Sequence, residues 1–318
     1  MPYYIHGTNY SESLYGTSSD DFIFGYGGHD YLSGGAGNDF LDGGSGDDDL
    51  IGGTGFNDLW GGSGWDWFTM SSRGSSGFSD DLILDFTLDE DQVNVSAWGV
   101  SDFSQVKALL GKDSTGSATL NAFYSGYDHL LTIDGVAPEE LISSDFVYSN
   151  SGAKNQTGTT YSDVMFGSRS ADILRGSSGN DILLGGIGND RLEGGSGIDE
   201  LIGGAGKDVL VGGSNADFFV FSAASETQPG ASYRDCISDF QKGSDKIDLS
   251  DIDARPDVSG NQAFTFINKS AFSSPGQVCY SQSNGNTIVS GNTDFDSSAE
   301  FQIELTGLYT LSAADFVL

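Results

Sequence analysis

The chain has 318 residues, with 13 Lys plus Arg against 46 Asp plus Glu and a formal net charge of -33. A field of this sign repels nucleic acid and anionic membrane surfaces, and it attracts cations. The two cysteines are too few for a disulfide scaffold, and no apolar run has the length of a membrane span. Because 37% of the residues are apolar, we expect a chain that compacts once its negative charge is compensated.

The N-terminal stretch MPYYIHGTNY has neither a basic region nor an apolar region, so it does not resemble a cleavable signal peptide. Immediately after it, residues 7–69 divide without gaps into seven nonapeptides. The sixth position of each is acidic or Asn, and the eighth is always apolar. The sixth positions are Glu12, Asp21, Asp30, Asp39, Asp48, Asn57 and Asp66, and the eighth are Leu14, Ile23, Leu32, Leu41, Leu50, Leu59 and Phe68.

Residues 158–220 form a second run of seven nonapeptides with the same two regular positions. The sixth positions are Asp163, Asp172, Asp181, Asp190, Asp199, Asp208 and Asp217, and the eighth are Met165, Leu174, Leu183, Leu192, Leu201, Leu210 and Phe219. The residues around each eighth position suit a short strand, and the glycine-rich hexad between strands suits a sharp turn. Two nonapeptides then make one coil, with strands stacked about 4.8 Å apart over a thin apolar core.

The segments that follow the two arrays also match each other. DLILDFTLDEDQVNVS (81–96) aligns with DCISDFQKGSDKIDLS (235–250), and LISSDFVY (141–148) aligns with LSAADFVL (311–318). We therefore expect two tandem modules. Their predicted parts are a first roll (1–70), a first β cap (71–150), a polar linker (151–157), a second roll (158–221) and a second β cap (222–318).

The aspartates of successive coils are predicted to lie directly above one another. Stacked carboxylates repel, and a hard divalent cation between coils reverses that interaction. Calcium suits such a site because it takes six to eight oxygen ligands, whereas zinc prefers His and Cys, and magnesium dehydrates reluctantly. Pairing each turn with the turn two repeats later predicts roughly four to five Ca²⁺ per roll. The predicted side-chain ligands are Asp21, Asp30, Asp39, Asp48, Asn57, Asp66, Asp163, Asp172, Asp181, Asp190, Asp199, Asp208 and Asp217.

Main-chain carbonyls of the glycine-rich turns are expected to complete these sites. The predicted donors are the carbonyls of Gly34, Gly35, Gly37, Gly43, Gly44, Gly46, Gly52, Gly53, Gly55, Gly185, Gly186, Gly188, Gly194, Gly195, Gly197, Gly203, Gly204 and Gly206. The first turns, such as GTSSDD and GSRSAD, lack the double glycine, so the terminal sites should be weaker. The site that Asn57 shares with Asp39 should also be weaker, because an amide is neutral.

The pattern G-G-x-G-x-D-x-U-x, where U is apolar, resembles the calcium-binding repeat of RTX proteins, and it covers 126 of the 318 residues. The segments at 216–250 and 301–318 resemble the C-terminal domain of serralysin-type proteases and the R-modules of alginate epimerases. The resemblance implies an all-β fold of two parallel β-rolls, each followed by a β-sandwich-like capping subdomain. It also implies export by a type I secretion apparatus through an uncleaved C-terminal signal, with calcium-triggered folding outside a bacterial cell. The closing residues DFVL fit that signal, and they equally fit a last edge strand.

Motifs for catalysis are not found in the sequence. It has no H-E-x-x-H or G-x-S-x-G, none of its five prolines follows an aspartate, and His6, His29 and His129 are scattered. We therefore expect a non-catalytic, extracellular calcium-binding module. One alternative is the export and folding tail of a larger secreted enzyme or toxin.

The other alternative is an adhesin or a module that binds extracellular polysaccharide, with Trp60, Trp65 and Trp67 as ligand residues. A plug at the open end of the roll is the favoured interpretation of these tryptophans, which precede the core residue Phe68. Cys236 is expected to be a small buried hydrophobic residue, and whether it meets Cys279 stays open.

Overall fold

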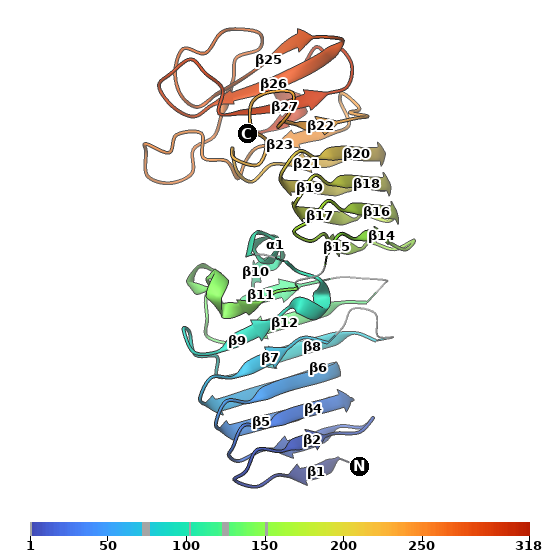
Figure 1. The fold of residues 1–318 in the computed structure, drawn as a ribbon, viewed down its shortest axis with the longest axis vertical. Helices are drawn as coiled ribbons and strands as arrows, with labels where there is room; N and C mark the ends of the chain where they lie inside the picture. Colours follow the sequence, from blue (N-terminus) through green and yellow to red (C-terminus); the bar gives the residue numbers. More distant parts are fainter. Residues whose placement is uncertain (1, 72–76, 102, 123–126, 150–151) are drawn as a thin grey trace. The chain divides into compact units, whose positions relative to one another are not determined.

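The computed structural model describes residues 2–71, 77–101, 103–122, 127–149 and 152–318. The chain divides into two compact units, Met1–Asn150 and Ser151–Leu318 (Figure 1). Each unit begins with a coiled stack of parallel strands and ends in a cap. Among the described residues, none of the helices combines the length and the apolar composition of a membrane span.

The first roll has two parallel sheets whose strands pair at an interval of 18 residues, as Asp21 pairs with Tyr3 and Tyr31 with Ser13. Consecutive repeats therefore alternate between the sheets. One sheet contains β1 (Tyr3–His6), β3 (Asp21–Phe24), β5 (Phe40–Ser45) and part of β6 (Asp49–Ser63). The other contains β2 (Ser13–Tyr15), β4 (Tyr31–Ala36), the rest of β6 and β7 (Trp67–Thr69).

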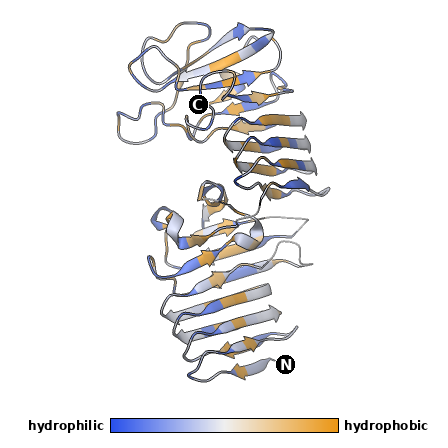
Figure 2. Ribbon diagram, in the orientation of Figure 1, coloured by the Kyte–Doolittle hydropathy of each residue, from blue (hydrophilic) through white to orange (hydrophobic). Residues whose placement is uncertain are grey.

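The core of the first roll is a single column of eighth-position side chains. Ile23, Leu32, Leu41, Leu50, Leu59 and Phe68 are all fully buried, whereas Leu14 in the outermost coil is half-buried. Figure 2 shows apolar segments within the strands. The all-β parallel roll predicted from the nine-residue pattern is confirmed.

The first cap continues the sheets of the roll. Strand β8 (Ser79–Ile83) pairs in parallel with both β6 and β12 (His129–Ile133), and β12 leads through antiparallel β11 (Ala118–Asn121) to β10 (Leu110–Lys112). On the other sheet, β9 (Gln92–Asn94) pairs with β7 and with β13 (Phe146–Val147). The helices of this cap are α1 (Phe103–Leu109) and the 3-10 turns Ser96–Trp98, Pro138–Glu140 and Ser143–Asp145.

The second roll repeats this construction. One sheet contains β14 (Asn155–Thr157), β16 (Ile173–Ser178), β18 (Arg191–Ser196) and β20 (Val209–Ser214). The other contains β15 (Val164–Phe166), β17 (Ile182–Ile187), β19 (Glu200–Ala205) and β21 (Phe218–Val220). The sequence places residues 155–157 in a linker, but they pair with β16 and form the first strand of this roll.

The second cap is built on β22 (Asp235–Ile237) and β23 (Lys246–Asp248), which extend the two sheets of the roll. Beyond β22 come β27 (Phe301–Leu305), β26 (Asn286–Asn292), β25 (Gln277–Ser283) and β24 (Thr265–Phe266). After the 3-10 turn Ala313–Asp315, β28 (Phe316–Val317) pairs with β23, so the DFVL segment does form a last strand.

The cysteines correct one sequence expectation. Cys236 is half-buried rather than buried, because in β22 the inward positions are taken by Asp235 and Ile237. Its Sγ lies 3.5 Å from Thr306 Oγ1. Cys236 and Cys279 are both free thiols.

Candidate metal centre

A ladder of hydrogen bonds links the sixth-position residues of successive coils. The backbone amide of Asp21 donates to Oδ1 of Asp39 at 2.8 Å, and the amide of Asp30 donates to Oδ1 of Asp48 at 2.7 Å. The same bond from residue n to residue n+18 recurs at Glu12, Asp39, Asp48, Asp163, Asp172, Asp181, Asp190 and Asp199. One oxygen of each acceptor side chain is therefore fixed by the backbone, and the carboxylates point into the stack between coils.

The second oxygen of most of these carboxylates is buried and has no hydrogen-bond partner among the described residues. The orphaned atoms are Oδ2 of Asp30, Asp39, Asp48, Asp66, Asp181, Asp190, Asp199, Asp208, Asp217 and Asp235. An isolated buried carboxylate oxygen is costly unless it is paired or coordinates a metal. These atoms therefore fit a row of bound cations in each roll.

Burial raises the pKa of these carboxyl groups in the ion-free protein. Desolvation is the main cause, and it raises the pKa of Asp39 and Asp48 to about 6 and that of Asp66 to about 7. In the second roll, desolvation and the nearby Asp235 raise the pKa of Asp208 to about 8. Cations held between the coils would restore the ionised form, so proton and metal compete for the same oxygens.

The terminal turns satisfy their carboxylates in another way. Oδ2 of Asp21 accepts hydrogen bonds from the amide of Thr17 at 2.5 Å and from its hydroxyl at 2.9 Å. Thr159 binds Asp163 and Ser168 binds Asp172 in the same manner. A hydroxyl residue follows the first glycine in these turns, where most of the inner turns have a second glycine. It supplies the donors that the inner aspartates lack, which gives a physical reason for weaker terminal sites.

Asn57 interrupts the row of carboxylates in the first roll but not its ladder of hydrogen bonds. Its Oδ1 accepts the amide of Asp39 at 3.0 Å, as an aspartate would. Its Nδ2 donates to Oδ1 of Asp81 at 2.8 Å, where the other roll has the orphaned oxygen of Asp208. An amide N–H thus occupies the direction that a cation would need.

The first glycine of each inner turn forms the floor of the space beside the carboxylate. A Cβ placed on Gly25 would lie 2.5 Å from Oδ2 of Asp30 and 2.5 Å from the carbonyl oxygen of Gly43. Carboxylate and carbonyl oxygens from successive coils therefore converge where the glycine has no side chain. The carbonyls that meet an aspartate Oδ2 in this way belong to Gly34, Gly43, Gly52, Gly61, Gly176, Gly185, Gly194, Gly203 and Gly212.

The glycines at the second and fourth positions of the turns stack backbone on backbone. Gly53 lies over the carbonyl of Gly35, and Gly55 lies over that of Gly37, with positive φ at both upper residues. The same stacking brings Gly62 over Gly44, Gly64 over Gly46, Gly204 over Gly186, Gly206 over Gly188 and Gly213 over Gly195. No side chain fits between these coils. Coordination by the carbonyls of the glycines at these two positions, including Gly197, remains a prediction.

The ladder runs past the last nonapeptide of each array, which the sequence reasoning missed. The amide of Asp66 donates to Asp91 Oδ1 at 3.0 Å, and the amide of Asp208 donates to Asp235 Oδ1 at 2.7 Å. Asp217 donates in the same way to Asp245. The signal was present in the aligned segments 81–96 and 235–250, whose shared aspartates include these acceptors, but their spacing departs from nine.

A separate oxygen cluster lies in the loop between β26 and β27. One carboxylate oxygen from each of Asp294, Asp296 and Glu300 falls within 4.8 Å of the others. Asn292 is fully buried, and its Nδ2 donates to the carbonyls of Asp296 at 2.9 Å and Ser298 at 2.8 Å. Its Oδ1 has no hydrogen-bond partner among the described residues. Neither the repeats nor their resemblance pointed to this loop.

The tryptophans do not plug the roll, so that interpretation was wrong. The exposed fractions of Trp60, Trp65 and Trp67 are 44%, 54% and 36%, whereas Phe68 is fully buried and contacts Phe86. The seventh and ninth positions of a repeat point outward when the eighth points inward, which places Trp67 and Trp60 on the outer faces.

The histidines lie on separate structural elements. His6 contacts the hydroxyl of Tyr26 at 2.8 Å, and His29 accepts the amide of Asp47 at 2.8 Å. His129 is fully buried on β12, 3.0 Å from the hydroxyl of Ser79.

Comparison with known proteins adds to this geometry. Residues 6–41 and 42–69 match the family of the RTX calcium-binding nonapeptide repeat, and residues 174–318 match the family described as Peptidase M10 serralysin C terminal.

Among solved structures, the AlgE6R3 subunit of the Azotobacter vinelandii mannuronan C5-epimerase is 25% identical. The match covers 54% of this chain and 81% of that subunit, with a TM-score of 0.30. The AlgE6R2 subunit is 26% identical over 51% of this chain and 91% of its own, with a TM-score of 0.25. The extracellular lipase LipA from Serratia marcescens is 16% identical, and the match covers all of this chain and 40% of the lipase, with a TM-score of 0.29.

The two family matches fall on the segments that carry the ladder and the second cap. The first unit is therefore similar to RTX calcium-binding repeats and the second to a serralysin-type C-terminal domain, in agreement with the resemblances of the nonapeptides and of the segments 216–250 and 301–318.

Proposed function

We propose that this protein is a secreted module whose two rolls bind calcium between their coils and fold when they meet it. The observation that carries the proposal is the row of buried Oδ2 atoms without partners in the described part of the chain. Six of them face a main-chain carbonyl of the neighbouring coil, namely those of Asp30, Asp39, Asp48, Asp181, Asp190 and Asp199. Calcium, when bound, would supply the positive charge that these oxygens lack.

The distribution of orphaned oxygens refines the expected number of ions. Four lie in the first roll, and six lie in the second roll and its junction with the cap. Asn57 accounts for part of this difference, because its Nδ2 donates where Asp208 has a bare oxygen. We infer that the second roll binds more calcium than the first.

Folding and export follow from the same electrostatics. Where calcium is scarce, the stacked carboxylates repel and keep the arrays expanded, a state suited to passage through a secretion channel. Where calcium is abundant, the energy of binding becomes folding energy. The match of residues 174–318 to a serralysin C-terminal family supports export of this kind by a type I apparatus.

The matched families are a repeat and a C-terminal domain, which supports action by binding rather than by catalysis. The loop with Asn292, Asp294, Asp296 and Glu300 would add one calcium site outside the rolls. Its oxygens come from one loop of the cap, so its occupancy should not depend on coil stacking.

A calcium titration followed by far-UV circular dichroism tests the proposal, with calorimetry for stoichiometry and magnesium as the control. We expect a cooperative gain of β signal with several ions bound, which magnesium does not reproduce. A chain that is fully folded in chelator and takes up no more than one or two ions would overturn the proposal.

A second candidate function is binding of an extracellular polysaccharide. It is favoured by the aromatic side chains on the outer faces of the first roll, among them Tyr4, Tyr15, Trp60 and Trp67. Retention of the calcium-loaded protein on insoluble polysaccharides tests this role, and passage through every matrix without delay would exclude it.

A further inference from the structure

One outer face of the first roll presents a row of five side chains across the strands. Register places Ser13 on β2 beside Tyr31 on β4, Tyr31 beside Asp49 on β6, Asp49 beside Trp67 on β7, and Trp67 beside Gln92 on β9. The two aromatic residues are thus two strands apart, roughly 9.6 Å, with a carboxylate between them.

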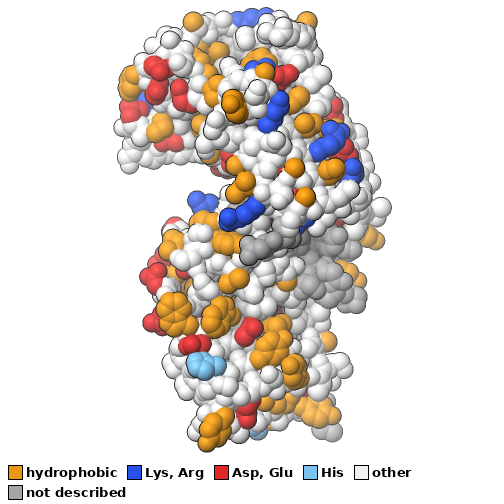
Figure 3. Space-filling model, viewed as in Figure 1, with side chains coloured by type: hydrophobic (Ala, Val, Ile, Leu, Met, Phe, Trp, Pro, Cys, Tyr) orange, Lys and Arg blue, Asp and Glu red, His pale blue; other side chains and the backbone are white. Residues whose placement is uncertain are grey.

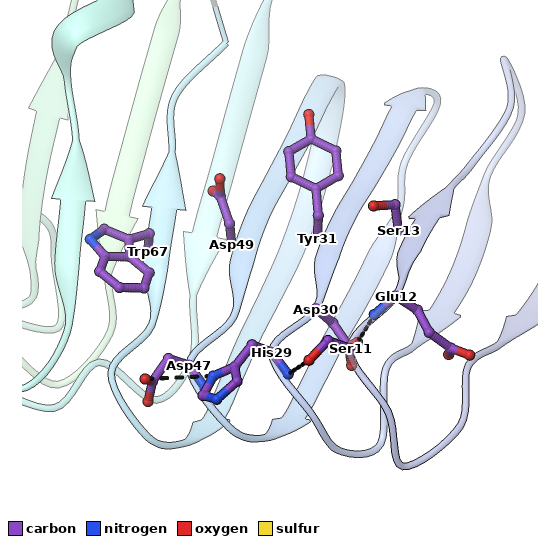
Figure 4. A pocket seen from close by; sticks show the side chains of 9 residues that line it. All are labelled: Ser11, Glu12, Ser13, His29, Asp30, Tyr31, Asp47, Asp49 and Trp67. Atoms are coloured by element: carbon purple, nitrogen blue, oxygen red, sulfur yellow. Dashed lines mark hydrogen bonds and ion pairs between the residues drawn. The ribbon is translucent and has the colours of Figure 1, made fainter.

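This row borders a cavity of about 580 Å³ (Figure 4). Tyr31, Asp49 and Trp67 form one side of it, and turn residues including Ser11, His29 and Asp47 form the other. In Figure 4 the rings of Tyr31 and Trp67 are both seen face-on against the strands, with Asp49 between them. The two rings therefore lie along the sheet and offer their faces to a ligand.

Neighbouring groups hold these three side chains in place. Trp67 Nε1 donates to Gln92 Oε1 at 3.0 Å, and Gln92 Nε2 donates to the carbonyl of Ser144 at 2.8 Å, which ties the indole to the cap. Thr69 Oγ1 donates to Asp49 Oδ1 at 2.7 Å, and Oδ2 of Asp49 has no donor within the described part of the chain. The ring of Tyr31 contacts that of Tyr15, with centroids 5.7 Å apart. The surface is ordered before any ligand arrives.

The chemistry of this surface fits a sugar chain. The electron-rich faces of Tyr and Trp attract the electropositive C–H groups of a pyranose ring, and a carboxylate between them accepts hydrogen bonds from sugar hydroxyls. The spacing of the two rings is close to the repeat of two sugar residues in an extended β-1,4-linked chain. Asp47 and Asp49 border the site, so their charge disfavours uronates and sulfated sugars.

We propose that Tyr31, Asp49 and Trp67 form a binding site for a neutral β-1,4-linked hexopyranose chain, which runs across the strands along the axis of the roll. The two rings stack on alternate sugar residues, and Asp49 binds hydroxyls of the residue between them. This inference rests on the polysaccharide-binding role proposed above and names its ligand class and its residues.

Calorimetry on the full chain in saturating calcium tests the site, with cellohexaose as the probe. Maltohexaose and a hexamer of mannuronate, of equal length, serve as controls for linkage and for charge. We expect binding of cellohexaose that is weakened at least about tenfold by Tyr31→Ala and by Trp67→Ala. Tyr161→Ala removes an exposed aromatic side chain from the second roll, outside any proposed saccharide site, and should leave the affinity unchanged. Circular dichroism of each variant in calcium confirms that the roll is intact.

Failure of this site can be distinguished from failure of polysaccharide binding as a whole. If cellohexaose binds equally well to wild type, Tyr31→Ala and Trp67→Ala, the site is wrong while polysaccharide binding survives. If maltohexaose or the mannuronate hexamer binds as tightly as cellohexaose, the proposed ligand class is wrong. If the wild type binds no saccharide of any kind, both proposals fail, and calcium-coupled folding is untouched.

Discussion

The two rolls share their interior and differ on their outer faces. The row Ser13, Tyr31, Asp49, Trp67 and Gln92 of the first roll corresponds in the second to Val164, Ile182, Glu200, Phe218 and Lys246. An acidic residue occupies the middle of both rows, but Tyr31 has no aromatic counterpart. By contrast, the column of buried apolar residues and the aspartate ladder are present in both rolls.

Other side chains on the outer faces diverge in the same way. In the first roll, the rings of Tyr4 and Phe22 stack with centroids 5.0 Å apart. In the second, Glu193 pairs with Arg191 at 2.6 Å and with Arg175 at 3.1 Å. Only three of the 13 Lys and Arg residues lie in residues 1–150, and Figure 3 shows basic side chains gathered on the second unit. The interior is constrained by cation geometry and coil contact, whereas the outer positions are free to specialise.

The largest effect is expected from filling the space between coils. A Cβ at Gly46 or Gly206 would lie well inside van der Waals contact with the carbonyl of Gly28 or Gly188, and φ is positive at both substituted residues. We expect Gly46→Ala and Gly206→Ala each to lower the free energy of unfolding in calcium by about 3 kcal/mol.

Urea denaturation measures this loss. Gly243→Ala is the matched control, because Gly243 also has positive φ but nothing lies near its Cβ position. It should cost only about 1 kcal/mol. Equal losses in the three variants would show that backbone conformation, rather than coil contact, selects the glycines.

A reciprocal exchange tests the difference between the two ladders. Asn57 and Asp208 occupy the sixth repeat of their arrays. We expect Asp208→Asn to remove one calcium ion from the second roll and Asn57→Asp to add one to the first. At calcium 100-fold above its Kd, each ion contributes about 2.7 kcal/mol. Calorimetric ion counts check the prediction, and an unchanged count in both variants would contradict the role of the orphaned oxygen.

The two rolls should also differ in how strongly pH affects their stability without calcium, and this effect is expected to be smaller than that of the ion count. Burial raises the pKa of Asp208 to about 8 but that of Asp39 and Asp48 only to about 6, all above the value of about 3.9 in an unfolded chain. The folded state therefore binds more protons. In chelator, stability is gained on acidification and lost as the pH rises through the folded pKa. The loss ends near pH 6 for Asp39 and Asp48 but continues to about pH 8 for Asp208, so the ion-free second roll should lose more stability between pH 6 and pH 8 than the first and should unfold at a lower pH.

Two probes distinguish the units in this experiment. All four tryptophans lie between residues 60 and 98, so their emission reports the first unit. Cys236 and Cys279 are free thiols of the second unit, and their reactivity relative to urea-unfolded chain at the same pH reports that unit. Loss of both signals at one pH would show that the carboxyl groups do not set the difference.

The smallest effect is expected on the outer face of the second roll. Glu193→Gln removes the ion pairs with Arg175 and Arg191, which are partly exposed to solvent. Exposed pairs of this kind contribute less than about 1 kcal/mol, and salt screens them. Thermal unfolding in low and high salt should show a small difference that disappears in high salt. A larger loss would mean that the outer faces contribute to stability as the interior does.

The strict period of the arrays made their interior predictable. A regular sixth and eighth position fixes which side chains stack on each other, so the buried column around Leu41 and the pairing of Asp30 with Asp48 follow from counting residues. The caps were harder to predict, because Asp91 and Asp235 join the ladder through loops of unequal length. The donors at the terminal turns, Thr17 and Ser168, depend on local geometry that residue spacing does not encode.

The outer faces differ from the prediction. The sequence groups Trp60, Trp65 and Trp67 with Phe68 in one aromatic plug, but strand alternation places Trp60 and Trp67, which lie beside inward positions, on the outside. The exposed row of Tyr31, Asp49 and Trp67 is likewise set by pairing at 18 residues. These three residues occupy the same position in alternate repeats, a relation that is easily missed when each repeat is considered singly.

Strand pairing at an interval of 18 residues limits how such a chain can grow or shrink. Insertion of one nonapeptide between Tyr31 and Trp67 would send every later repeat to the opposite sheet, so the two rings would face away from each other. Insertion of two would add one coil and keep both faces in order. Duplications and deletions that preserve a surface must therefore come in pairs of repeats, and the smallest heritable unit of this architecture is twice the unit visible in its sequence.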